Sequence, residues 1–387
     1  MALASAGEAS GTIEDWVTAL SSVTYPASRN AAAPALDASR QRHARAIATW
    51  LLICCGMVFA MAVIGAVTRL TESGLSMVEW KPLIGILPPL TETEWNRVFD
   101  LYRETPEYRY VNAGMGLEEF KHIFFWEWFH RFWGQMIGFV FLLPFLWFWA
   151  TKRIPKGLMP TLVGLFLLGG LQGGIGWFMV VSGLVDRPSV SHYRLALHLG
   201  VAFLIFALML WVALGLLDPK PEGSRSAAAP ALRRHAGLAL GLVAVTAAWG
   251  AFVAGLDAGM IYNTWPLMGG QIIPSDMWFL NPAPLNFVEN HAGVQFTHRW
   301  LAMVTGLVVL GLWWRAGKAD IGPRGHRLGQ AVGVMVVVQI ALGIATLLTV
   351  VAIPLAAVHQ AGALTLIALL VWFRHEVKRS RWTSQGS

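Results

Sequence analysis

Eight apolar runs constrain the fold of this 387-residue chain more than any other feature of its sequence. A helix needs about 20 predominantly apolar residues to cross a bilayer, and the lipid interior excludes irregular backbone. Hydrophobic residues make up 56% of the chain, which is typical of a membrane protein with many spans. The sequence therefore predicts an all-α polytopic membrane protein with eight transmembrane helices, at about 46–68, 123–150, 157–182, 193–217, 236–256, 292–314, 327–350 and 355–373.

Lysine and arginine residues gather in alternate connectors between these runs. Such residues favour the cytoplasmic side of a membrane, so both chain termini are expected in the cytoplasm. The net charge of +7 has the same explanation, and nucleic acid is not implied. The basic residues of these connectors are Arg40, Arg42 and Arg45; Lys152, Arg153 and Lys156; Lys220, Arg225, Arg233 and Arg234; Arg315, Lys318, Arg324 and Arg327; and Lys378, Arg379 and Arg381.

The segment 1–45 is rich in Ala and Ser and contains no apolar core of signal-peptide length. It is expected to form a disordered cytoplasmic tail. Its acidic residues disfavour a transit peptide, so the bacterial cytoplasmic membrane is the expected location and the mitochondrial inner membrane is the alternative. Residues 218–235 are expected to form a cytoplasmic linker, and 375–387 a second cytoplasmic tail.

The two long outer connectors, at about 70–122 and 257–291, are unequal in length. In the first, Thr91 followed by Glu94 has the spacing of a capping box that starts a surface helix. The apolar face of that helix would consist of Trp95, Val98, Phe99 and Tyr102. A connector of this size can cover a site from outside.

Two adjacent cysteines, Cys54 and Cys55, lie within the first apolar run. They cannot form a disulfide framework. We expect them to be buried and to pack as small apolar residues, with a strained vicinal disulfide as the alternative.

The second half of the sequence repeats residues of the first half at regular offsets. The matches pair Gly65-Ala66, Glu72, Gly74 and Trp80 with Gly250-Ala251, Asp257, Gly259 and Trp265; His130-Arg131 and Gly138 with His298-Arg299 and Gly306; Gly174-Ile175 with Gly343-Ile344; and Ala196 and His198 with Ala357 and His359. Regular self-similarity of this kind indicates a duplication. The chain is therefore expected to form two duplicated four-helix bundles, at 46–217 and 236–374, related by an axis along the membrane normal.

A charged cluster stands inside the second apolar run, at Glu127, His130 and Arg131. Ionisable side chains in a membrane helix cost free energy, so a functional role is the default expectation for them. Glu127 and His130 are three residues apart and share one face of the helix. A neutral imidazole is a good axial ligand for haem iron, and a carboxylate beside it can accept or deliver protons. A polar contact that only joins helices is the alternative for this stretch taken alone.

Four histidines, His130, His198, His298 and His359, occupy repeat-equivalent positions near the outer ends of even-numbered spans. Counted from the predicted helix starts, each lies roughly 6 to 10 Å below the outer surface. This pattern predicts two bis-histidine metal sites. Zinc normally needs further Cys, His or carboxylate ligands, whereas a six-coordinate haem needs two histidines and a large apolar slot, which a four-helix bundle can supply.

Seven further histidines fall at helix ends or in connectors and are expected to be solvated, with a site role left open for His122 and His192. They are His43, His122, His192, His235, His291, His326 and His375.

Four arginines lie near the outer helix ends: Arg69, Arg131, Arg194 and Arg299. Guanidinium groups pair with carboxylates in a bidentate way, so these residues are candidates for binding haem propionates. For Arg131 and Arg299, which directly follow two of the histidines, structural or propionate pairing is favoured. For Arg69 and Arg194, a side chain that only extends to the membrane interface is an equal alternative.

The two halves differ beside their first histidine. Glu127 stands three residues before His130, but Gln295 stands three residues before His298. Glutamine is nearly isosteric with glutamate and does not titrate. The difference suggests that the first half performs proton-coupled chemistry, while the second holds a permanent haem that relays electrons.

A family signature runs through the first half. It consists of TRLTESGLSMVEW at 68–80, Pro106-Glu107-Tyr108, Glu119-Phe120-Lys121, and Glu127 with His130-Arg131. With it the sequence resembles the haem A synthases of proteobacteria and mitochondria over nearly the whole chain after residue 45. The resemblance implies oxidation of a methyl group of haem O to a formyl group, giving haem A for terminal oxidases.

The same resemblance implies roles for individual residues. Substrate haem O would bind between His130 and His198 with Glu127 required for activity, and haem B would bind between His298 and His359. Two features depart from the family: the cysteine pair of one branch's outer loop is absent, and Gly134-Gln135 stands where Gly-Arg is common. From this resemblance we hypothesise that Glu127 handles protons or polarises the substrate environment.

Two other functions fit parts of the pattern. A di-haem electron-transfer cytochrome that oxidises quinol fits the four histidines, and a duplicated transporter fits the repeat. Expected partners of a haem A synthase are the enzyme that produces haem O, an unidentified electron donor, the lipid bilayer and factors of terminal oxidase assembly. Homo-oligomerisation is left open.

Overall fold

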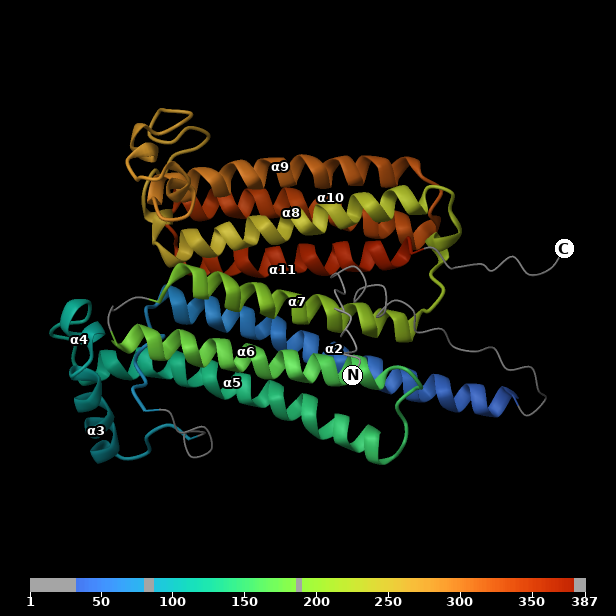
Figure 1. Ribbon diagram of the computed structural model, residues 1–387, viewed down its shortest axis with the longest axis horizontal. Helices are drawn as coiled ribbons and strands as arrows, with labels where there is room; N and C mark the ends of the chain where they lie inside the picture. Colours follow the sequence, from blue (N-terminus) through green and yellow to red (C-terminus); the bar gives the residue numbers. More distant parts are fainter. Residues whose placement is uncertain (1–32, 80–86, 186–189, 379–387) are drawn as a thin grey trace, which may run out of the picture.

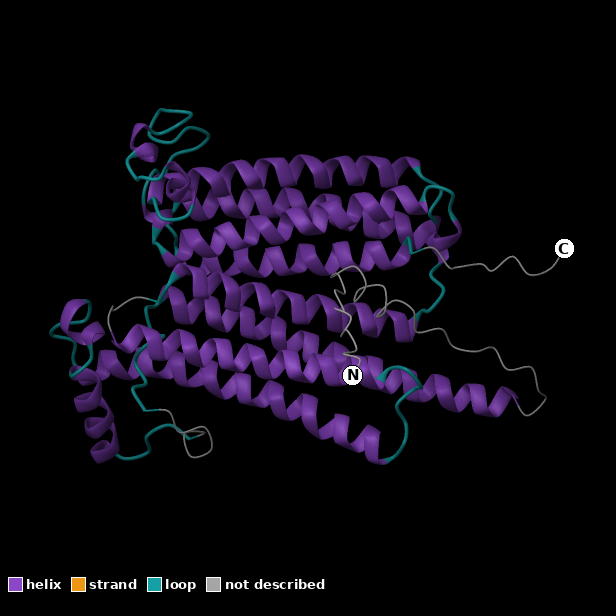
Figure 2. Ribbon diagram, in the orientation of Figure 1, coloured by secondary structure: helices purple, strands orange, loops and turns teal. Residues whose placement is uncertain are grey.

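Eight long apolar helices form the body of the protein, as the sequence predicts. The computed structural model describes residues 33–79, 87–185 and 190–378. Within those ranges helices and loops make up the chain, apart from one isolated β-bridge between Met268 and Gln271 (Figure 2). The long helices are α2 (Ala33–Leu70), α5 (Leu117–Ala150), α6 (Met159–Val185), α7 (His192–Leu217), α8 (Ala229–Gly255), α9 (His291–Lys318), α10 (Gly322–Leu348) and α11 (Ile353–Glu376).

These helices lie roughly parallel, in two groups of four (Figure 1). One group contains α2, α5, α6 and α7, and the other contains α8 to α11. The groups meet where α7 contacts α8 and where α11 contacts both α2 and α7. The amide of Gln360 on α11 donates a hydrogen bond to the backbone oxygen of Ala62 on α2 at 2.6 Å, so the contact includes a specific polar link across the groups.

The long connectors lie at one end of the molecule, and the short connectors lie at the other (Figure 1). The connector between α2 and α5 carries α3 (Glu92–Arg103) and α4 (Pro106–Tyr110). The connector between α8 and α9 carries three 3-10 turns: η2 (Ala258–Met260), η3 (Ser275–Trp278) and η4 (Ala283–Phe287). A fourth, η1 (Glu222–Arg225), joins the two groups at the short-connector end.

Helix α3 forms as its sequence predicts. Thr91 is the N-cap, and its hydroxyl accepts a hydrogen bond from the backbone amide of Glu94. The predicted apolar face contributes to a separate core in which Tyr102 packs against Phe120 of α5. The connector is thereby fixed over the N-terminal end of α5.

Two helices begin earlier than expected. Helix α2 starts at Ala33, so residues 33–45, predicted as the end of a disordered tail, are helical instead. Their Ala and Arg residues have high helix propensity, so the segment forms a helix although its hydrophobicity is low. Helix α5 starts at Leu117, where Glu119 accepts a hydrogen bond from the backbone amide of Gly116. Because α5 begins before residue 123, the depth of His130 below the membrane surface cannot be obtained from the predicted start of this helix.

Some sequence predictions concern residues outside the described ranges. The rest of the predicted tail, 1–32, and the end of the second tail, 379–387, are among them. So is Trp80, which the repeat pairs with Trp265. Glu72 and Asp257, another predicted pair, both adopt a left-handed backbone with φ of 51° just after α2 and α8. This shared conformation accords with the predicted pairing.

Candidate functional site

A cavity of about 1610 Å³ opens between the helices and receives residues from both groups. This exceeds the several hundred Å³ usual for a site that binds one small ligand. All four predicted histidines, His130, His198, His298 and His359, line it. Residues of the main hydrophobic core, among them Val58, Phe141 and Val243, also line the cavity, so its wall is continuous with the packed core.

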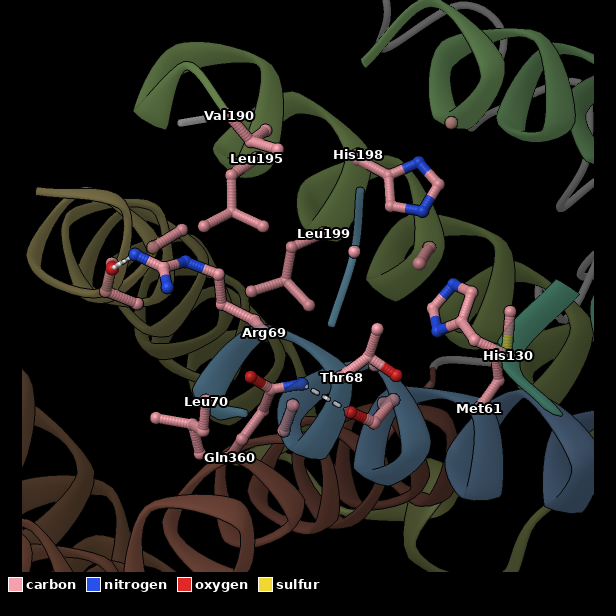
Figure 3. Close-up of a pocket in the computed structure, with 18 of the residues that line it drawn as sticks. Met61, Thr68, Arg69, Leu70, His130, Val190, Leu195, His198, Leu199 and Gln360 are labelled. Carbon is pink, nitrogen blue, oxygen red and sulfur yellow. Dashed lines mark hydrogen bonds between the residues drawn. The ribbon is translucent and has the colours of Figure 1, made fainter. Parts of the chain in front are cut away.

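His130 on α5 and His198 on α7 turn their rings into the same space (Figure 3). Each imidazole packs against a glycine of a neighbouring helix. A Cβ atom added to Gly65 would lie 3.0 Å from Cε1 of His130, and one added to Gly176 would lie 3.0 Å from Cε1 of His198. Glycine at these positions lets the helix backbone approach the Cε1 atom of the ring closely. Two supported imidazoles facing one space are suitable donors for a metal centre with two axial ligands.

The second group repeats this arrangement. A Cβ atom on Gly250 would lie 3.1 Å from Cε1 of His298, and one on Gly343 would lie 2.9 Å from Cε1 of His359. The contacts make Gly176, rather than Gly174, the counterpart of Gly343. The predicted pairing of Gly174 with Gly343 was therefore wrong by two residues, because dense glycines on α6 allow several alignments.

Three of the histidines have hydrogen-bond partners on neighbouring helices. Nδ1 of His298 lies 3.1 Å from the backbone oxygen of Thr246. Nδ1 of His198 lies 3.1 Å from the amide nitrogen of Gln172, and Nδ1 of His359 lies 3.2 Å from that of Gln339. The Thr246 carbonyl can accept the Nδ1 proton of His298, and an acceptor of this kind orients a ligating imidazole. The amide nitrogens of Gln172 and Gln339 are donors, so they fix the position of the His198 and His359 rings through Nδ1 as the acceptor. For His130, Nδ1 is buried and has no hydrogen-bond partner within the described part of the chain.

The sequence reading did not identify Gln172 and Gln339. Each lies four residues before the glycine that supports the neighbouring histidine. The two glutamines therefore occur at the same offset as Gly176 and Gly343. An alignment in the correct register would have revealed them as a repeated polar pair inside apolar helices.

Glu127 is buried, with 3% of its surface exposed, and both of its oxygens accept hydrogen bonds. The Ser76 hydroxyl and the Met77 backbone amide each donate to Oε2 at 2.7 Å. Arg131, one turn further along α5, pairs with Oε1 and also donates to the backbone oxygen of Met77. The connector after α2 thus presents donors to this carboxylate.

Gln295 is also buried, with 2% exposed, but its contacts have the opposite polarity. Its amide donates to the backbone oxygens of Ala258 at 2.9 Å and Ile261 at 2.6 Å. Its oxygen accepts from Arg299 at 3.2 Å. The connector after α8 presents acceptors at the place where the first half presents donors.

The four predicted arginines lie in different settings. Arg69, Arg131 and Arg299 line the cavity. Arg69, which Figure 3 labels, donates to the backbone oxygen of Ala254 at 2.7 Å. It also pairs with Asp257 at 2.9 Å. Arg194 is not among the lining residues within the described ranges, and its guanidinium stacks over the ring of Phe178 at 4.6 Å. The structure thus brings three of the four to the cavity.

Two of the seven histidines expected to be solvated are buried. His192 is 7% exposed and packs against Phe252, and His375 is 2% exposed and packs against Trp211. Both lie where the two groups of helices meet. Their positions at helix ends in the sequence did not indicate this burial. Cys54 and Cys55 are buried free thiols, as expected, and the vicinal disulfide is absent.

Comparison with known proteins places these features in a family. A family model described as "Cytochrome oxidase assembly protein" (COX15-CtaA) matches residues 48–371. The chain is 60% identical to "Heme A synthase" of Rhodospirillum centenum over 347 residues, which cover 90% of each chain. It is 50% identical to "Heme A synthase" of Paramagnetospirillum magneticum over 87% of this chain and 94% of that one. For "Heme A synthase" of Nitrosospira multiformis the identity is 48%, over 86% and 94%.

Proposed function

Because this chain belongs to the cytochrome oxidase assembly protein family that includes these haem A synthases, we infer that it oxidises a methyl group of haem O to a formyl group and so produces haem A. The observation that carries this conclusion is the identity of 60% across nine-tenths of both chains. The product haem A would serve the assembly of terminal oxidases. The protein is therefore an oxidoreductase of the membrane.

We propose that His130 and His198 hold the substrate haem O and that His298 and His359 hold a resident haem B. The residues present fit a haem in each half. Both pairs of imidazoles line one large cavity. Each ring lies so close to a glycine that a side chain at the glycine position would press against it. In the second half, the contact of Thr246 with Nδ1 of His298 leaves Nε2 available as a ligand. A bound haem would supply the redox chemistry.

Glu127 is the proposed catalytic residue. It lines the cavity one turn before His130, and Ser76, Met77 and Arg131 fix the direction of its carboxylate. A fixed negative charge close to the substrate stabilises positive charge that develops there, and it needs no reorganisation when the reaction occurs. This favours the polarising role over proton handling for Glu127 itself.

The arginines of the cavity are the proposed partners of the haem propionates. Arg69 and Arg299 combine a cavity position with a guanidinium that can pair with a carboxylate in a bidentate way. Arg69 pairs with the exposed Asp257, whereas Arg131 pairs with the buried Glu127. Because a buried pair is harder to break, the proposed role of Arg131 is to fix that carboxylate. Arg194 lies beside Phe178, and its proposed contribution is the weaker one of a positive charge at the helix end.

The proposed location is a bacterial cytoplasmic membrane, with both termini in the cytoplasm. Eight apolar helices make the protein a multi-pass membrane protein, and the relatives named above are bacterial. Within the described ranges, the basic connectors between the long helices lie at the end opposite α3 and α4, which supports this orientation. The proposed partners are the enzyme that produces haem O, an electron donor and oxidase assembly factors.

The test is expression in a host that supplies haem O but has no haem A synthase of its own. Haems are extracted from the membranes and identified by their masses. We expect haem A with the wild type and none with His130→Ala. Protein that is folded, contains only haem B and leaves haem O unconverted in the presence of a donor would instead indicate an electron-transfer cytochrome.

A further inference from the structure

A second carboxyl group, that of Glu107, lines the cavity from the outer connector. It lies in α4, where Thr105 forms the N-cap and Pro106 begins the helix. Only 5% of Glu107 is exposed. Its Oε2 is buried and has no hydrogen-bond partner among the residues that the structure describes. Thr105 and Pro106 start the helix, so the Glu107 side chain is not needed to cap it.

The environment of Glu107 favours its protonated form. Burial is the largest cause and the charge of Glu127 on α5 is the next, and the net result of all contributions is a pKa raised from 4.5 to about 8. A hydrogen bond from Tyr102 on α3 lowers the pKa in part, and the charge of Glu72 raises it slightly. Glu107 is therefore mainly protonated at neutral pH, and it can release that proton when a base appears nearby.

The two buried carboxyl groups of the cavity differ in how they are held. Glu127 accepts from a hydroxyl, a backbone amide and a guanidinium, so its environment is complete without a proton. Glu107 has one oxygen with no partner in the described part of the protein. Glu72, which also lines the cavity, is exposed to solvent.

We propose that Glu107 is the proton-transfer residue of the first-half cavity, which delivers protons from the outer side of the membrane to the site beside Glu127 and His130. This inference rests on the proposed oxidation of haem O. In the step, the O–H bond of the protonated Glu107 carboxyl breaks and its proton bonds to a water molecule in the cavity, which passes on a proton of its own to the site beside Glu127 and His130. The carboxylate left behind takes up a proton from water at the outer surface, so Glu107 returns to its starting form and no electron moves.

The test uses three variants of the full-length protein. Glu107→Gln keeps the shape but cannot titrate, and Glu107→Asp keeps a titratable group. Glu104→Gln, in the same connector, changes an exposed carboxylate and is the matched control. The rate of haem A formation is measured on both sides of pH 8, and the infrared band of protonated carboxyl groups is recorded over the same range without substrate.

In the wild type, we expect the rate to fall as the pH rises through about 8, because Glu107 then loses its proton. Glu107→Gln should lose this pH dependence and lower the rate by about 100-fold. Glu107→Asp should restore part of the rate, and Glu104→Gln should match the wild type. A Glu107→Gln protein with the rate and pH profile of the wild type would overturn the proposal.

The infrared measurement separates this proposal from the proposed function. A carboxyl band that titrates near pH 8 in the wild type and is missing in Glu107→Gln supports the assignment of the protonated group, whatever the activity. The absence of such a band overturns the assignment. A wild type that forms no haem A in any condition overturns the proposed function instead.

Discussion

The two halves of the protein place a glycine against each of their histidines but surround the histidines differently. Glycines support the imidazoles in both halves. Beside His130, however, the connector donates hydrogen bonds to the carboxylate of Glu127, whereas beside His298 the connector accepts hydrogen bonds from the amide of Gln295. The difference extends beyond one side chain, because each connector has the polarity that its partner requires. A carboxylate–guanidinium pair and an amide–guanidinium pair have therefore been built on one framework.

The halves also differ in packing. Helix α10 lies close against α9, and an added Cβ on Gly333 would lie 2.3 Å from the ring of Trp313. Helix α6 touches α5 much less, and the space beside Gly169, Gly170 and Gly173 is open. These α6 glycines line the cavity. A tight half suits a resident group, and an open half suits a substrate that must enter and leave.

Substitution of Glu127 should have the largest effect on activity. In Glu127→Gln, an amide group would face either the donors Ser76 and Met77 or the guanidinium of Arg131, and the fixed charge would be lost. We expect haem A formation to fall by about 100-fold or more, with the resident haem retained. The rate is measured in membranes, and the absorption spectrum reports the retained haem. Full conversion by this variant would remove the proposed role of the charge.

The reciprocal change tests the polarity of the second half. In Gln295→Glu, a carboxylate would face the backbone oxygens of Ala258 and Ile261, with only Arg299 as a favourable partner. A buried charge in such a setting costs about 3 kcal/mol, so the midpoint of thermal unfolding in detergent should fall. The matched control is Gln295→Met, which removes the amide without adding charge. A midpoint equal to the wild-type value for Gln295→Glu would contradict the polarity argument.

A pair of alanine substitutions tests the difference in packing. Gly333→Ala forces Trp313 to move and should destabilise the protein by about 1 to 3 kcal/mol. Gly169→Ala meets no atom within 4 Å and should leave stability unchanged or raise it by up to about 1 kcal/mol, because alanine favours helix over glycine. Thermal unfolding of substrate-free protein compares the two. Equal losses at both positions would mean that the halves are packed alike.

The outer connectors allow a smaller test, of stability against pH. The raised pKa of Glu107 means that the folded protein binds this proton more tightly than the unfolded chain does. The resulting stabilisation is complete below pH 4.5 and is lost as the pH rises to about 8. Glu107→Gln should therefore show a weaker decline in stability over this range. Asp276→Asn, which changes an exposed carboxylate beside Tyr262 in the second connector, should leave the decline as it is.

The sequence predicted the eight helices and the four cavity histidines, because long apolar runs and rare polar residues within them leave few alternatives. It missed Gln172 and Gln339, whose role depends on which face of one helix meets the next. Glu107 belongs to the family motif Pro106-Glu107-Tyr108, but the sequence indicates no role for it, since the burial of a connector residue depends on tertiary packing. The sequence also did not predict that one connector donates hydrogen bonds and the other accepts them, because it does not show which backbone amides and carbonyl groups face a buried side chain.

The most direct test of the division between the halves is the binding of haem O to purified protein. We predict that the wild type contains one haem B and binds haem O in addition. His130→Ala should keep the haem B and bind haem O at least about tenfold more weakly. His298→Ala should lose the haem B while its first-half site stays intact. Unchanged binding of haem O to His130→Ala, or loss of haem B from it, would contradict the assignment of substrate to the first half.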